Sequence, residues 1–280
     1  MMERLRHAAS AGVLLVLLPM AGACQTSQIE IPQLPTAPTI DGSLREWRTA
    51  AYSGDWWDIE RLSQTPWFDP ERNRLTIHEG EVAGDVDLQA RYYVAWDEAY
   101  LYLGAEAQDN ANDVVDPAHE AKRWYFKDCV CWFIEAPRDN RPESFETGDN
   151  AFCFLIDTAR PDYGAWWRHG EPGHAYVEEP LPAGTFDYAL RMDPWGRSTA
   201  DFSLEVRLRM DLLFGRSDPD WAGASVGQSL GLEIVHTDPD GGDYGGHLLI
   251  HGAGDNDATW GEAVLVGPRA PEEPASVSPE

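Results

Sequence analysis

Two short acidic segments carry the residues of this sequence best suited to binding a metal ion. Residues 109–113 read Asp-Asn-Ala-Asn-Asp, and residues 238–243 read Asp-Pro-Asp-Gly-Gly-Asp. Both place oxygen ligands close together on flexible backbone, as suits Ca²⁺, which takes roughly six to eight oxygens. Neither segment has EF-hand spacing, and solvated Asp-Gly turns produce the same pattern. The sequence predicts calcium at both segments. The candidate ligands are Asp109, Asp113, Asp238, Asp240 and Asp243.

Tryptophan is abundant, with 12 in 280 residues, and many of these lie outside the segments that resemble strands. An indole in a loop must pack on a neighbour or meet a ligand, and sugars present C–H faces that stack on such rings. Two regions combine an indole with polar groups, as a small-ligand pocket requires. Their residues are Arg123, Trp124, Asp128, Trp166 and Trp167. Since neighbours on an extended segment point to opposite sides, only one of the last two should face a ligand.

Apart from Cys24, the sequence has three cysteines, Cys129, Cys131 and Cys153. The first two share one face of a predicted strand and the third lies on the next strand. One cross-strand disulfide and three buried free thiols are both compatible with this placement. Spacing of i, i+2 on a strand does not suit a metal held by three thiolates.

No segment has the spacing of a common catalytic motif. The sequence lacks G-x-S-x-G, H-E-x-x-H and a phosphate-binding glycine loop. Carboxylates are abundant, but no motif pairs an acid with a nucleophile as glycoside hydrolysis requires. We therefore expect no enzymatic activity.

A long hairpin is the clearest element that could position these residues. Between residues 88 and 96, every second side chain is apolar or aromatic, and the residues between them are Gln89, Arg91, Tyr93 and Ala95. This two-residue period is typical of a strand with one buried face. Asp97–Ala99 reverses the chain. A second strand then runs from Tyr100 into the acidic segment at Asp109.

Further strands are predicted after the hairpin, separated by turns rich in Gly, Pro and Asp. They cover residues 129–135, 151–157, 186–192, 201–210, 229–236 and 262–266. Apart from one short helical turn at 118–124, helical periodicity is absent. The pattern predicts an all-β fold, an antiparallel β-sandwich. Its loops are long, at 52–87, 110–128, 138–150, 160–185 and 238–260.

Four motifs occur along the chain in an order that resembles one family. They are IDGSLREW (40–47), VAWDEAYLYL (94–103), DCVCWFIE (128–135) and WGEAVL (260–265). The chain resembles the family 9 carbohydrate-binding modules and their DOMON-like relatives. The resemblance implies a jelly-roll or immunoglobulin-like sandwich, a terminal sugar held between two aromatic rings, and structural calcium. Cys131 replaces an acidic residue that is usual in the third motif.

Some DOMON-like domains carry haem through Met with His or Lys. Here Met192, Met210 and His236 lie on predicted strands. Core packing accounts better for both methionines, and a hydrogen bond within the sheet accounts for the histidine. We therefore expect no haem.

The N-terminus has the pattern of an export signal. Arg4 and Arg6 precede an apolar run, Ala11–Leu18, and small residues precede Cys24. The run is too short to span a bilayer. Two outcomes fit the pattern: a lipoprotein anchored to a membrane through Cys24, or a plain secreted protein. Residues 1–23 are thus expected to be a signal peptide and the mature chain to lie in the periplasm or at the cell surface.

One domain should follow the signal. Residues 24–37 and 268–280 are rich in Pro, Ser, Thr and Glu and read as a tether and a disordered tail around a sandwich at 38–267. The net charge of −27 excludes nucleic acid as a partner, because binding would require basic residues to neutralise phosphates.

These observations predict an exported carbohydrate-binding protein that acts without catalysis. Its partner would be an oligo- or polysaccharide, held by loop tryptophans. The alternative is a docking subunit that uses the same fold to bind a membrane complex or another exported protein.

Overall fold

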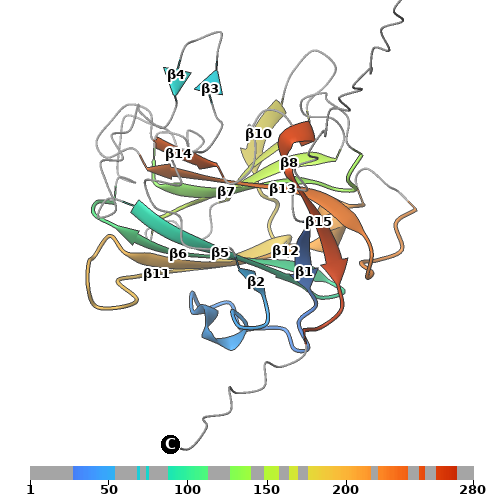
Figure 1. The fold of residues 1–280 in the computed structure, drawn as a ribbon, viewed down its shortest axis with the longest axis horizontal. Helices are drawn as coiled ribbons and strands as arrows, with labels where there is room; N and C mark the ends of the chain where they lie inside the picture. Colours follow the sequence, from blue (N-terminus) through green and yellow to red (C-terminus); the bar gives the residue numbers. More distant parts are fainter. Residues whose placement is uncertain are drawn as a thin grey trace, which may run out of the picture.

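The computed structural model describes residues 28–53, 68–69, 74–75, 88–112, 127–139, 148–157, 164–169, 176–215, 220–238, 246–249 and 257–269. Within these residues, two β-sheets face one another in two layers (Figure 1). No helix in this part of the chain is long and apolar enough to cross a membrane. The all-β sandwich predicted from the sequence is confirmed.

Sheet A contains the strands of one layer. Its order is β1 (Ile29–Pro32), β15 (Gly261–Val266), β13 (Ser229–Asp238), β7 (Cys129–Glu135), β8 (Asp149–Leu155), β9 (Gly164–His169) and β10 (Tyr176–Pro180), and β14 (Gly246–Leu249) also pairs with β13. The pairing of β1 with β15 is parallel. The other pairings in sheet A are antiparallel.

Sheet B forms the other layer. Its order is β11 (Phe186–Met192), β12 (Phe202–Arg209), β6 (Tyr100–Asp109), β5 (Leu88–Trp96) and β2 (Tyr52–Ser53). A separate pair joins β3 (Phe68–Asp69) to β4 (Arg74–Leu75). Short helical turns are η1 (Leu44–Glu46), α2 (Met210–Leu213) and η4 (Asp257–Thr259).

The core lies between the sheets and follows the two-residue period of the strands. In the hairpin, the inward residues are the ones expected from the sequence, from Leu88 to Trp96 on β5 and from Leu101 to Ala107 on β6. Val130, Trp132 and Ile134 of β7 face them from sheet A. Burying one large apolar side chain of this kind stabilises the fold by about 1.5–3 kcal/mol.

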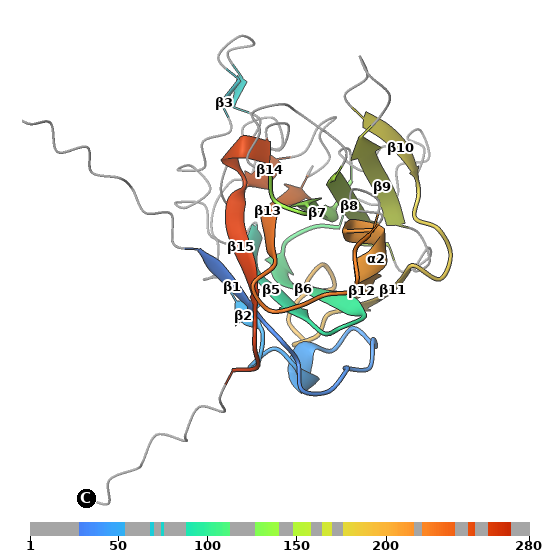
Figure 2. The ribbon, with the colours of Figure 1, turned by 90° about the vertical axis from the view of Figure 1, so that its right-hand side faces the viewer.

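A second apolar cluster covers the outer face of sheet B, where the chain around η1 lies across β6 (Figure 2). The Trp47 indole packs there against Tyr102, with ring centroids 6.1 Å apart. Gly104 makes this approach feasible, because a Cβ at that position would stand 2.7 Å from Leu44 Cδ2. The IDGSLREW motif is therefore an added layer on sheet B.

Glu205 of β12 fixes that layer through three hydrogen bonds. The Trp47 Nε1–H donates to Glu205 Oε1 at 2.6 Å. The backbone N–H groups of Asp41 and Gly42 donate to Oε2 at 2.9 and 3.0 Å. Gly42 has φ +81°, a conformation that glycine adopts at little cost. The Asp-Gly pair and the Trp of the motif thus bind one buried carboxylate.

The structure corrects the expected chain path in several places. Part of the expected tether, Ile29–Pro32, forms β1, because Ile29 and Ile31 bury their side chains in the core. The expected loop 160–185 contains β9 and β10 instead, the expected loop 52–87 contains β2, β3 and β4, and the expected loop 238–260 contains β14. Residues 1–23, Cys24, the short helix expected at 118–124 and residues 270–280 lie outside the described residues.

Candidate functional site

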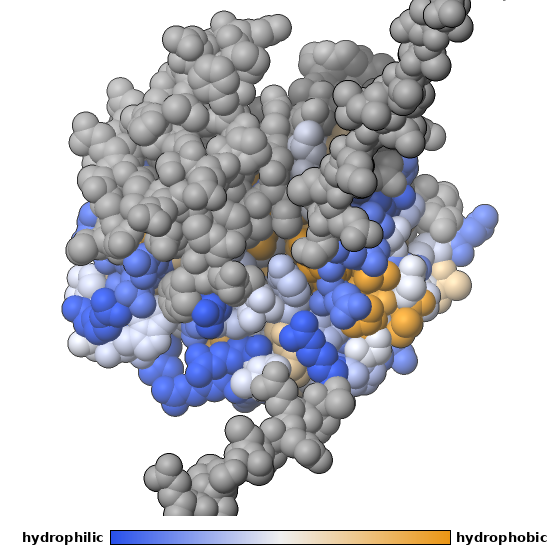
Figure 3. All heavy atoms as spheres, in the orientation of Figure 1, coloured by the Kyte–Doolittle hydropathy of each residue, from blue (hydrophilic) through white to orange (hydrophobic). Residues whose placement is uncertain are grey.

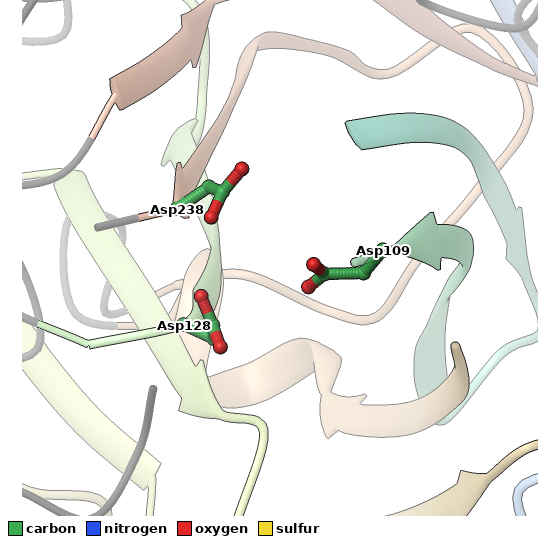
Figure 4. A group of neighbouring side chains, drawn as sticks. All are labelled: Asp109, Asp128 and Asp238. Carbon is green, nitrogen blue, oxygen red and sulfur yellow. The ribbon is translucent and has the colours of Figure 1, made fainter. Parts of the chain in front are cut away.

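Three aspartates meet at one end of the sandwich, between the two sheets. Asp109 is the last residue of β6 and Asp238 the last of β13, while Asp128 directly precedes β7. Carboxylate oxygens of the three lie within 4.8 Å of one another. Figure 4 shows the three carboxylate groups directed toward a common point. The aspartates are at most 4% exposed.

Strand periodicity explains why these side chains converge. On β6, Asp109 continues the inward-facing set that includes Ala105 and Ala107. The antiparallel register pairs Thr237 with Cys129, so Asp238 and Asp128 lie next to each other at the adjacent ends of β13 and β7. On each of the three strands, the row of inward-facing apolar side chains is therefore followed by an inward-facing aspartate.

Hydrogen bonds hold the strand ends around this group. Asp109 accepts the N–H of Ala111 at 2.9 Å, and its own N–H donates to Asp201 Oδ1 at 3.1 Å. The Ile156 N–H donates to the Asp128 carbonyl at 3.0 Å. The Thr237 hydroxyl donates to the Lys127 carbonyl at 2.6 Å. The carboxylates are therefore carried by a well-connected frame.

Three buried carboxylates at this separation repel one another and must be protonated or balanced by positive charge. Lys127, also buried, is next to the group in sequence. An all-oxygen set of this kind fits a hard cation such as Ca²⁺. We refer to Asp109, Asp128 and Asp238 as the Asp triad.

The Asp triad brings together residues that the sequence assigned to separate sites. Asp109 and Asp238 were expected to belong to two separate calcium sites, and Asp128 to a sugar site. The structure places all three in one group because β6, β7 and β13 meet at the same end of the sandwich. The other candidate ligands, Asp113, Asp240 and Asp243, lie outside the described residues.

A second carboxylate group, Glu135, Asp139 and Asp257, has a different character. Arg138 forms an ion pair with Glu135, and its Nη1 donates to the Asp257 carbonyl at 2.7 Å. Burial raises the pKa of Glu135, while the hydrogen bonds from Asp139 and Arg138 act against that change. An arginine already supplies positive charge here, so this group does not call for a metal ion.

His236 lies deep between the sheets, two residues before Asp238 on β13. It shares a 2.8 Å hydrogen bond with the Tyr92 hydroxyl through Nδ1, and its ring contacts Phe202. Burial lowers the pKa of His236 to about 3. The bond runs between sheets, whereas the sequence suggested one within a sheet.

The low pKa of His236 predicts a specific loss of stability in acid. The pKa of His236 in the folded state is below the ordinary value of 6.5. The contribution of the neutral ring to the free energy of unfolding is therefore fully present above pH 6.5 and is lost progressively as the pH falls toward 3. The free energy of unfolding, measured with denaturant at pH 7, 5 and 4, should fall less steeply for His236→Gln than for wild type, because glutamine keeps an acceptor for Tyr92 but does not titrate. Parallel declines would contradict the prediction.

The structure describes only some of the residues expected to bind sugar. Trp166 and Trp167 lie on strand β9, not in a loop, and pair with Phe152 and Ala151 of β8. Phe152 belongs to the core, so Trp167 occupies the register position on the outer face of sheet A. Arg123 and Trp124 lie outside the described residues.

The three cysteines lie on that outer face as buried free thiols. Cys131 pairs with Cys153 across β7 and β8, and Cys129 Sγ lies 3.6 Å from Cys131 Sγ. Burial raises the pKa of Cys131. For Cys129, burial raises the pKa, but hydrogen bonds with the two other thiols and the Phe154 backbone, together with the charge of Lys127, lower it overall to about 6.

Comparisons with known proteins place the fold. No family model matches the chain, and no curated protein matches it. The fold is similar to a family 9 carbohydrate-binding module from Caldicellulosiruptor kristjanssonii in complex with cellotriose, with TM-score 0.54 and 15% identity over 90% of this chain and 100% of that one. The glucose complex of a family 9 module from the same organism gives TM-score 0.53 and 15% identity over 87% and 98%.

A candidate carbohydrate-binding protein from Bacteroides uniformis is also similar, with TM-score 0.54 and 9% identity over 85% of this chain and 98% of that one. At these identities the likeness concerns the fold. The order of the four sequence motifs had implied the same architecture. The chain therefore has the fold of the family 9 carbohydrate-binding modules.

Proposed function

We propose that this protein binds carbohydrate without catalysis, on the outer face of sheet A near β7, β8 and β9. The main support is its similarity in fold to modules that hold cellotriose and glucose, over 90% and 87% of the chain. The site itself is argued from the residues of this chain, since a fold alone does not fix a function.

The register supports a site that spans β8. Arg123 and Trp124 precede β7 in the sequence, and Trp167 lies on β9 at an outer-face position. Two interstrand spacings separate these strands, about 10 Å, which is comparable to the width of a sugar bound between groups on either side. An indole on one side and polar groups on the other would provide stacking and hydrogen bonds.

The centre of this face is buried, so a sugar would bind at the margins of the face. Cys131 and Cys153 occupy the positions between the two sides, and both thiols are buried. Thiols are weak hydrogen-bond partners. Direct contacts to hydroxyls would therefore come from Arg123, and stacking from Trp124 and Trp167, whereas Asp128 belongs to the Asp triad between the sheets.

Calcium is proposed to support the site by holding its end of the sandwich together. The Asp triad would provide ligands from both sheets, with Asp128 leading directly into β7. Bound Ca²⁺ would balance the carboxylate charge and fix the strand ends. Export with lipid attached at Cys24 is proposed from the N-terminal sequence pattern.

Calorimetric titration of protein lacking residues 1–23 with mono- and oligosaccharides, in calcium, tests the proposal. One neutral sugar class should give saturable heat, and Trp167→Ala should weaken its binding by at least about tenfold, which corresponds to about 1.4 kcal/mol. Val226→Ala is the control, because this apolar side chain is 61% exposed and lies in neither of the two proposed sites. Equal losses in both variants, or no heat from folded protein with any sugar, would contradict the proposal.

A further inference from the structure

A pocket of about 660 Å³ opens on the outer face of sheet B, on the other layer from the proposed sugar site. Its floor comes from Arg91 and Tyr93 of β5 and from Glu106 and Gln108 of β6. The chain after η1 forms one wall. The turn between β11 and β12 and the residue Arg269, after β15, form the rest. Hydrophilic residues cover much of the sheet B side in the view of Figure 3.

The charge of this pocket is opposite to that of the protein. Four arginines line it, Arg48, Arg91, Arg197 and Arg269, and among the lining residues that the structure describes Glu106 is the one carboxylate. The described part of the lining therefore carries three net positive charges in a chain of net charge −27. Four of only 21 basic residues gather here from segments far apart in sequence.

The single carboxylate is already engaged by donors from the pocket. Arg48 Nη1 donates to Glu106 Oε1 at 3.0 Å, and the Tyr93 hydroxyl donates to Oε2 at 2.6 Å. Burial and this hydrogen bond raise the pKa of Tyr93 to about 12, so the phenol remains a neutral donor. Arg91 lies directly opposite Glu106 in the strand register.

Two other arginines donate hydrogen bonds to neutral acceptors, and among the described residues no carboxylate pairs with either of them. Arg197 Nη1 donates to the Gln108 side-chain oxygen at 2.7 Å. Arg269 Nη1 donates to the Ala51 carbonyl at 2.8 Å. Each guanidinium keeps further N–H donors in a planar fork, the geometry that binds carboxylate or phosphate with two bonds.

The pocket also offers an aromatic surface and enough room for a small molecule. Trp195 lines it and is 37% exposed, one of the few large apolar side chains at the surface of the described chain. A ring or C–H face of a ligand could stack there. The volume lies within the range of about 300–1,000 Å³ found for small-ligand sites.

From these features we propose that the pocket binds a small organic oxyanion, a sugar-sized molecule carrying one or two carboxylate or phosphate groups. The arginines bind the oxyanion and Trp195 packs against the body of the ligand. A long polyanion is disfavoured, because it would extend beyond the pocket over the acidic surface. The inference is independent of the sugar site on sheet A.

Calorimetry with digalacturonate, glucose 6-phosphate and neutral cellobiose tests this proposal. At least one of the two anions should bind with a Kd below about 1 mM, and the two arms distinguish a carboxylate ligand from a phosphate ligand. Binding should weaken when NaCl is raised from about 0.05 to 0.5 M, because salt screens the arginines. Cellobiose heat that persists in Trp195→Ala belongs to the sheet A site.

Substitutions separate specific binding from general charge effects. Arg197→Gln should weaken anion binding about tenfold or more, and Trp195→Ala should weaken it as well. Arg209→Gln is the control, since it removes the same charge from an exposed residue of β12 that is paired with Asp211 outside the pocket. All three sites are exposed, so the variants should fold, and thermal unfolding checks this. Failure of both anions to bind, or equal losses in Arg197→Gln and Arg209→Gln, would overturn the proposal.

Discussion

Chelation of calcium should lower the thermal unfolding midpoint of this protein, and Asp238→Asn should remove most of that effect. The Asp triad brings three carboxylates within 4.8 Å of one another between the sheets. A cation at 1,000 times its Kd stabilises the folded state by about 4 kcal/mol. For a domain of this size each kcal/mol corresponds to about 2–4 °C. A shift on the order of 10 °C is therefore expected between calcium and chelator.

The effect of Asp238→Asn on the unfolding midpoint should have opposite signs in calcium and in chelator. In calcium, Asp238→Asn loses a charged ligand and should unfold at a lower temperature than wild type. In chelator, it should unfold at a higher temperature, because one of three mutually repelling buried charges is gone. A general loss of packing would lower the midpoint in both conditions, so the crossover is specific to cation binding.

Asp187→Asn is a matched control for this experiment. Asp187 lies on β11, where its carboxylate pairs with Arg207 and is 56% exposed, so its removal should change neither the midpoint nor its calcium dependence appreciably. Differential scanning calorimetry in calcium, magnesium and chelator measures all three proteins. An unchanged wild-type midpoint across these conditions would rule out the calcium site.

Much of the fold follows from short-range rules that the sequence displays directly. The β5–β6 hairpin could be predicted because alternation and an Asp-containing turn both act over a few residues. Strand β1 was missed because its four residues pair with β15, more than 230 positions away. Strands β9 and β10 were missed because Gly and Pro signals around them favoured a loop.

The Asp triad shows what sequence reasoning could have added. Counting in steps of two from the core residues of β6, β7 and β13 reaches Asp109, Asp128 and Asp238 in turn. Their convergence was therefore predictable once the three strands were known to end together. The arginine pocket had no such signal, since Arg91, Arg197 and Arg269 come from unrelated segments joined only by tertiary structure.

Glu205→Gln should destabilise the fold by about 2 kcal/mol, because it places an amide donor against groups that are already donors. Glu205 is fully buried and accepts three N–H groups, from Asp41, Gly42 and Trp47. Burial raises the pKa of Glu205 and the three donors oppose that change. The variant removes the cost of a buried charge but supplies only one accepting oxygen. At least one of the three donors is then left without an acceptor.

A double-mutant cycle with Trp47→Phe identifies which effect dominates. Phenylalanine keeps an aromatic ring over Gly104 but removes the indole N–H that donates to Glu205 Oε1. In the double variant, the glutamine oxygen can accept from Asp41 and Gly42 while its NH₂ no longer meets a donor. The combined loss in denaturant unfolding should therefore be smaller than the sum of the single losses by about 1 kcal/mol. Additive losses would mean that Trp47 anchors the outer layer through packing alone, and that its bond to Glu205 contributes little.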